Sequence, residues 1–244
     1  MGFNEVADPT AHLTTPDEPE EAINVFQPVD DAGEAFTPGV WLNEVYGMVF
    51  GYDPVERAQE FLAGDWKSYA RCGAAWGRLG AACQDLSQNI STGNSSLDAT
   101  WDGNAADAAF VYFKTIAERC DGLKSELDSL QNAYESISQA VSVSSELAAT
   151  GLSQIEDSAT VVAISAAAGE LTSWTGWGAA VGYGIAAVEI LRMVKLWGDV
   201  TGAIGTAESV AQTTVLGITL TSKGVADTFH NFPLPGDPYN HPAA

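Results

Sequence analysis

The side chains best suited to covalent or metal chemistry are few in this 244-residue chain, and they stand far apart. They are Cys72, Cys83, Cys120, His12, His230 and His241. Zinc sites draw on closely spaced groups such as CxxC or paired histidines, and the sequence has none. It therefore predicts no metal, no cofactor and histidines without functional partners.

Acidic side chains offer acid–base chemistry, but with 32 of them against 10 basic ones no pair stands out. The sequence also lacks a nucleophile elbow, an HExxH helix, a P-loop and a dinucleotide fingerprint. We therefore predict that the protein is not an enzyme. The net charge of −22 argues against binding nucleic acid or anionic lipid head groups, because both require a basic surface.

The elements that would position these side chains are helices. Asp53, Pro54 and Glu56 make a favourable helix start, with a break allowed at Gly64-Asp65. Apolar residues then recur every three or four positions, which is the helical period. This stripe is Leu62, Trp66, Tyr69, Cys72, Trp76, Leu79, Cys83, Leu86 and Ile90.

A second helix is predicted from Asn104 to about Ala148, after a turn over residues 91–103. It would be roughly 65 Å long at about 1.5 Å per residue. Its apolar residues alternate at steps of four and three, the heptad pattern of a coiled-coil seam. They are Phe113, Ile116, Cys120, Leu123, Leu127, Leu130, Tyr134, Ile137 and Val141. The two stripes match in length, which favours an antiparallel hairpin.

The chain divides by composition into four segments. Residues 1–38 are predicted to be a disordered acidic tail, because they are rich in proline and contain no base. The hairpin takes residues 39–151 and includes a short docking helix near residues 40–50. Residues 152–222 form an Ala/Gly-rich apolar helical region, and residues 223–244 a Pro-rich extended tail. The expected fold class is all-α, a long antiparallel helical hairpin with an additional C-terminal helical layer.

Two features bear on export and on membranes. The first basic residue is Arg57, so the N-terminus lacks the basic region of a cleavable signal peptide. Residues 171–188 carry no charge, but this segment falls just short of the ~20 apolar residues that a spanning helix needs. A close-packed helix is the favoured interpretation, and membrane contact through residues 171–188 is the alternative.

The three cysteines fall on the predicted core-facing stripes. Small buried hydrophobic side chains are the simpler interpretation, and a disulfide between the two helices is the alternative. If the turn centres near residue 101, Cys83 faces Cys120; if it centres near residue 96, Cys72 does. Export would allow such a bond to form, since the cytoplasm keeps thiols reduced.

Trp101-Asp102-Gly103, placed between two long amphipathic helices, resembles the signature of the WXG family of type VII secretion substrates. The order of three segments, residues 64–66, 101–109 and 174–184, is similar to the N-terminal region of actinobacterial polymorphic toxins. These include an outer-membrane channel protein that carries a necrotizing toxin. The resemblance covers about residues 40–225.

This resemblance implies that the secretion machinery or a partner reads the hairpin surface near Trp101, with Phe110, Tyr112 and Phe113 as partner-contact candidates. The alternative is structural: Trp101 packs at the turn and Gly103 supplies a tight backbone. Family members often carry a Y-x-x-x-[DE] export signal after the second helix. Tyr134–Ser138 lacks the final acid, and Tyr52–Glu56 fits but precedes the hairpin, where we interpret it as a helix cap.

We therefore expect a non-enzymatic type VII secretion substrate or targeting module that acts through helix–helix contacts. It would be secreted or at the cell surface, as a homodimer or a heterodimer with a WXG-family protein. A partner would then be able to supply the export signal. The alternatives are a membrane-inserting channel component that uses residues 158–191, and an intracellular scaffold or chaperone for a separate toxin.

Overall fold

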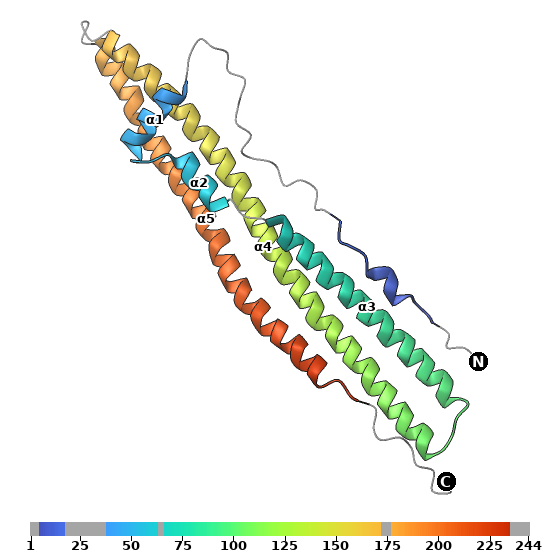
Figure 1. Cartoon of the computed structure of the whole chain (residues 1–244). Coiled ribbons are helices and arrows are strands. Elements are labelled where there is room, and N and C mark those ends of the chain that lie inside the picture. The colour runs from blue at the N-terminus through green and yellow to red at the C-terminus, as the bar shows by residue number, and fades with distance from the viewer. Residues whose placement is uncertain (1–4, 18–37, 63–65, 172–176, 235–244) are drawn as a thin grey trace. The chain divides into compact units, whose positions relative to one another are not determined.

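The structure is a computed structural model that describes residues 5–17, 38–62, 66–171 and 177–234 (Figure 1). These residues form five α-helices and no strand, so the expectation of an all-α protein is confirmed. The helices are α1 (Pro38–Val49), α2 (Pro54–Leu62), α3 (Trp66–Asp98), α4 (Asn104–Leu171) and α5 (Trp177–His230). A short 3-10 helix, η1 (Pro9–His12), precedes them.

The chain forms two compact units. Unit 1 comprises residues 1–19, 67–137 and 212–244, and unit 2 comprises residues 20–66 and 138–211. Helices α4 and α5 contribute to both units. This division differs from the predicted segments, because α4 runs through position 151 without interruption.

In unit 1, α3 packs against the first part of α4 in the opposite direction. The Ser87 hydroxyl donates to the Ala117 carbonyl at 2.8 Å, and the Asn94 amide donates to the Phe110 carbonyl at 3.0 Å. The core between them also takes in the end of α5. It consists of Cys83, Leu123, Leu127, Leu130 and Val225, with Trp76, Leu79, Ile218 and Phe232 packed against it.

Most of the predicted heptad seam on α4 is buried. Its buried members are Cys120, Leu123, Leu127, Leu130, Ile137 and Val141. At the end near the turn, Phe113 remains 37% exposed. The apolar spacing therefore identified the inward face of α4 correctly for six of these positions.

Glycines on one side of α3 allow α4 to approach closely. A Cβ atom at Gly73 would lie 3.3 Å from the Tyr134 Cβ, and one at Gly80 would lie 3.0 Å from the Asp128 Oδ1. Because α4 lies on this glycine side, the apolar stripe predicted for α3 is only partly covered. Cys72 and Leu86 are exposed, and their prediction as core residues is wrong.

The predicted turn over residues 91–103 is too long, because α3 continues to Asp98. The Ser95 and Ser96 hydroxyls donate to carbonyls one turn earlier, at 3.0 and 2.9 Å. These residues, which often mark loops, thus satisfy their hydroxyls within the helix. The turn is confined to residues 99–103.

Helix α4 also runs past its predicted end near Ala148 to Leu171. Gly151 does not break the helix, and α5 packs closely against it: a Cβ atom there would collide with the Val200 Cγ2. Seven residues earlier, the Ser144 hydroxyl donates to the Ala203 carbonyl at 2.9 Å. Seven residues later, Ser158 is 1% exposed. Ser144 and Gly151, two small residues seven positions apart, therefore line the α4–α5 contact in unit 2.

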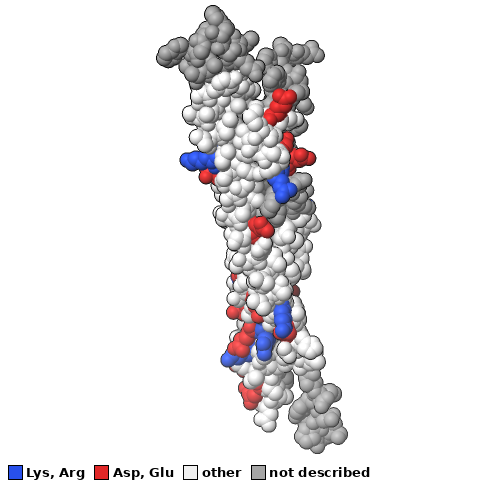
Figure 2. All heavy atoms as spheres, turned by 90° about the vertical axis from the view of Figure 1, so that its left-hand side faces the viewer, with Lys and Arg blue, Asp and Glu red and all other residues white. Residues whose placement is uncertain are grey.

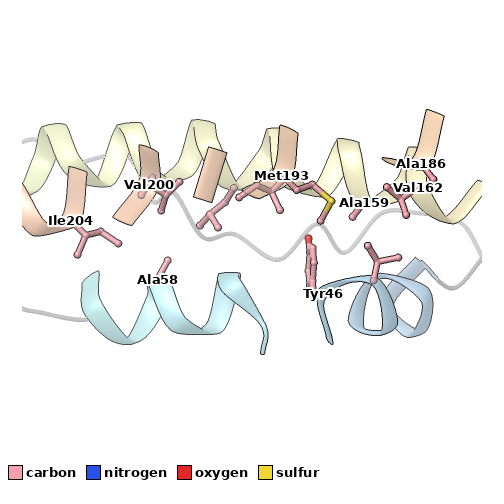
Figure 3. Close-up of a cluster of buried hydrophobic side chains, with 12 residues drawn as sticks. Tyr46, Ala58, Ala159, Val162, Ala186, Met193, Val200 and Ile204 are labelled. Atoms are coloured by element: carbon pink, nitrogen blue, oxygen red, sulfur yellow. The ribbon is translucent and has the colours of Figure 1, made fainter. Parts of the chain in front are cut away.

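The core of unit 2 brings α1 and α2 onto α4 and α5 (Figure 3). Tyr46 of α1 and Ala58 of α2 point toward Met193 and Val200 of α5. Val45 and Tyr46 are each 4% exposed, so the docking helix predicted near residues 40–50 is confirmed. The Asp53 carboxylate accepts the Val55 N–H at 2.8 Å and caps α2, as its sequence predicted.

Both predicted tails contain ordered structure. Residues 5–17 were expected to be disordered, yet Val6 donates its N–H to the Asn89 Oδ1 at 2.8 Å. Polar side chains of α3 hold this segment by hydrogen bonds. The prediction of disorder considered only how much apolar surface the segment could bury, so it did not include these bonds. At the other end, residues 223–230 belong to α5 rather than to an extended tail, because Val225 packs in the core of unit 1.

No helix in the described part of the chain has the length and hydropathy to cross a membrane. Residues 172–176 of the predicted apolar segment 171–188 lie outside the described residues. In the described part of that segment, Ala186 is buried and Val188 is 64% exposed.

Candidate interaction site at the α3–α4 turn

The turn between α3 and α4 depends on Gly103. The Trp101 N–H donates to the Leu97 carbonyl at 3.0 Å and closes the end of α3. Gly103 then takes a φ of +104°, and its carbonyl accepts the Asp107 N–H at 3.0 Å to begin α4. No atom lies within 4 Å of the position that a Cβ would take there, so the requirement for glycine is conformational rather than steric.

This geometry leaves Trp101 partly exposed. Its exposed fraction is 42%, and Asp102 beside it is exposed too. Leu97 and Val111, on the two helices that meet at the turn, are 40% and 62% exposed. The turn therefore exposes part of a tryptophan, a residue type that often anchors protein interfaces, and the two helices that it joins expose further apolar side chains.

The three partner-contact candidates after the turn differ in their surroundings. Phe110 is half-buried, and the buried Asn94 holds its carbonyl. The Tyr112 hydroxyl donates to the Pro233 carbonyl at 3.3 Å, and its ring packs edge-on against Phe113 at 5.5 Å. Phe113 presents the most surface of the three. The roles of Asn94 and Pro233 gave no signal in the sequence.

The position of the turn decides which cysteine of α3 lies opposite Cys120. Since α3 ends at Asp98, Cys83 lies one turn from Ser87 and Cys120 one turn from Ala117, the pair joined by a hydrogen bond. Cys83 therefore faces Cys120, and the alternative pairing of Cys72 with Cys120 is wrong. All three are free thiols in the structure, so the Cys83–Cys120 bond remains a prediction.

Burial sets the chemistry of the two inward thiols. It raises the pKa of the Cys83 thiol, and burial followed by the neighbouring Cys83 raises the pKa of the Cys120 thiol. Cys72 is exposed. At neutral pH, the thiolate form needed for reaction is therefore disfavoured at both buried positions.

The two tyrosine motifs lie in different settings. The Tyr52 hydroxyl accepts a hydrogen bond from the Trp197 indole at 2.9 Å, and Asp53 next to it caps α2. Tyr134 packs against Tyr69, with ring centroids 5.9 Å apart. The interpretation of residues 52–56 as a helix cap is confirmed.

Charged side chains are sparse on the face that Figure 2 shows. The sequence explains this, because between Lys195 and Lys223 α5 carries charge only at Asp199 and Glu208. Within the described residues, no group of three or more His, Cys, Asp or Glu is placed to hold a metal ion.

His12 has a partner, contrary to prediction: its Nε2 lies 2.9 Å from the Asp85 Oδ2. His230 is exposed at the end of α5, and His241 lies outside the described residues.

Comparison with models of protein families, with characterised proteins and with solved structures gives no match for this chain.

Proposed function

We propose that this protein is a non-enzymatic substrate or targeting module of type VII secretion. In this proposal residues 39–151 act as a WXG-type helical hairpin through helix–helix contacts. One observation carries it: Trp101 is 42% exposed in a turn that requires Gly103 and that joins two long helices. A tryptophan held at the surface by a short turn is available to a partner without unfolding of either helix.

The proposed partners are the secretion machinery and a second helical protein of the same type. On the two helices that this turn joins, Leu97, Val111 and Phe113 also expose apolar area. The net charge of −22 makes two copies of this chain repel each other. A less acidic, WXG-family partner is therefore favoured over a homodimer.

The test is the abundance of the protein in washed culture supernatant of its native host, with and without the type VII secretion ATPase. Trp101→Ala should lower this abundance about tenfold or more, since truncation of an anchoring tryptophan costs about 2 kcal/mol or more in affinity. Phe229→Ala, at an aromatic residue on α5 that is 55% exposed, is the control. A lysis marker is followed in parallel.

Each outcome decides between functions. Export that requires the ATPase and fails with Trp101→Ala, while thermal unfolding of the variant is unchanged, supports the proposal. Retention in the cell in both strains contradicts it and favours an intracellular scaffold, or a channel component if the protein pellets with membranes. Normal export of Trp101→Ala would show that recognition during export does not depend on Trp101.

A further inference from the structure

Residues 5–17, here called the strap, lie along α3 within unit 1 (Figure 1). The strap runs in the opposite direction to α3, since residues 6–7 meet Asn89 and residues 14–17 meet Arg78. Its central turn is η1, which Asp8 caps by accepting the Thr10 N–H at 2.9 Å. Hydrogen bonds from the Thr10 hydroxyl and N–H lower the pKa of Asp8, so this cap is charged at neutral pH.

Asn89 holds the strap by its backbone. Its Oδ1 accepts the N–H groups of Val6 at 2.8 Å and of Ala7 at 3.1 Å, and its Nδ2 donates to the Ala7 carbonyl at 2.8 Å. The side-chain amide thus pairs with the two donors and one acceptor of the Val6–Ala7 backbone, which lies in a bend. Asn89 is only 4% exposed. These bonds require no particular strap side chain, so the contact recognises the backbone rather than a sequence.

Arg78 holds the other end. Its Nη1 donates to the Thr14 carbonyl at 3.0 Å and the Thr15 carbonyl at 2.7 Å, and it also contacts the Thr14 hydroxyl. Nη2 lies 3.2 Å from the Asp17 Oδ2, but this carboxylate is 96% exposed. Such an exposed ion pair contributes little. The carbonyl contacts are therefore the main anchor, and again they involve only the strap's backbone.

Between these anchors, the His12 Nε2 lies 2.9 Å from the Asp85 Oδ2. Arg78, Asp85 and Asn89 are spaced by seven and four residues, which places them on one face of α3. The α4 contact at Gly80 is two residues from Arg78, about 200° around the helix. The strap and α4 therefore occupy opposite sides of α3.

The strap buries almost no bulky apolar side chain. Val6 is 60% exposed and Leu13 is 61% exposed. Neither hydrophobic core cluster of the described residues includes a strap residue. The strap is held by polar contacts on a face that α4 does not use, so its departure would leave the core of unit 1 intact.

We propose that the face of α3 marked by Arg78, Asp85 and Asn89 is a binding site for a peptide segment that it holds by backbone groups, and that the strap is its tethered ligand, which detaches and rebinds while unit 1 stays folded. The ligand class is a segment that offers an N–H pair and a carbonyl to Asn89, and two carbonyls to Arg78 about eight residues later along the chain, with a 3-10 turn between them. This inference is independent of export.

The first test is amide hydrogen exchange in the full-length protein. The Val6 and Ala7 amides should exchange about 10- to 1,000-fold more slowly than free peptide, yet faster than the core of α4, as expected for local opening. Asn89→Ala should remove this protection. Asn132→Ala, at an exposed asparagine on α4, is the matched control and should leave it unchanged. Core amides of α4 report whether each variant is folded.

The second test supplies the ligand in trans. Ala7→Pro removes the Ala7 N–H in the full-length chain and weakens the strap while leaving the α3 face unaltered. A labelled synthetic peptide of residues 1–19 should then bind saturably, and adding Asn89→Ala should abolish this binding.

The proposal is overturned if the strap amides of the wild-type protein exchange as fast as free peptide, or as slowly as the α4 core. Strap protection that survives Asn89→Ala overturns it too. So does the absence of saturable peptide binding to the Ala7→Pro protein up to millimolar concentration.

Discussion

Gly151→Ala tests the close contact of α4 and α5 in unit 2. In the interior of an exposed helix this change stabilises a protein by about 1 kcal/mol, because alanine has the higher helix propensity. At Gly151, however, the new Cβ would collide with the Val200 Cγ2, and Val200 is 2% exposed. A short, branched, buried side chain cannot swing away, and overpacking of this kind costs about 1–3 kcal/mol.

The two contributions together predict that Gly151→Ala is neutral or destabilising by up to about 2 kcal/mol. Gly205→Ala is the matched control, since Gly205 lies on α5 in the same unit and a Cβ atom there would have no other atom within 4 Å. It should stabilise by about 1 kcal/mol. The free energies of unfolding of the two variants should therefore differ by about 1–3 kcal/mol.

The assay is urea unfolding followed by circular dichroism at 222 nm, with the slope m compared between variants. A double variant with Val200→Ala sharpens the test. Val200→Ala alone leaves a cavity, and Gly151→Ala in that background should become stabilising because its methyl group now has room. Equal stabilisation by Gly151→Ala and Gly205→Ala in the wild-type background would refute the contact.

Two further predictions concern titratable groups. Burial, then the carboxylates of Glu156 and Asp53, raise the pKa of Tyr46. The stability that the neutral Tyr46 side chain contributes is therefore full below the pKa of an unfolded tyrosine, about 10, and is lost as the pH rises above that value. Urea unfolding at a series of alkaline pH values should show a smaller loss of stability for Tyr46→Phe than for the wild-type protein, and no such change for Tyr183→Phe, at an exposed tyrosine. An equal dependence of the free energy of unfolding on pH in all three proteins would contradict the burial of Tyr46. Among the cysteines, Cys72 should react with a disulfide reagent at the rate of a free thiol, and Cys83 and Cys120 far more slowly, because burial raises their pKa values. Oxidised glutathione should then join Cys83 to Cys120 in a Cys72→Ser protein, and a persistent pair of free thiols would show that their geometry does not permit the bond.

The helical character of the chain was readable from the sequence because it rests on local periodicity. Apart from Tyr134, the heptad positions from Cys120 to Val141 are buried as their spacing predicts, and the cap at Asp53 and the turn glycine at Gly103 follow from local backbone requirements. Each of these signals is contained within a few turns of one helix. No knowledge of the partner helix is needed to recognise it.

Only the tertiary structure decided which faces meet. The same periodic stripe predicts Cys72 and Leu86 to be inward, but α4 approaches α3 over Gly73 and Gly80, where missing side chains let the backbones come close. The sequence predicts a helix end near Ala148, but α4 continues through Gly151, where Val200 of α5 packs against it. Nothing in the sequence around Asn89 distinguishes it from other polar residues, whereas in the structure residues 6–7 supply its hydrogen bonds. In each case the deciding partner is distant in sequence, so no local pattern contains the information.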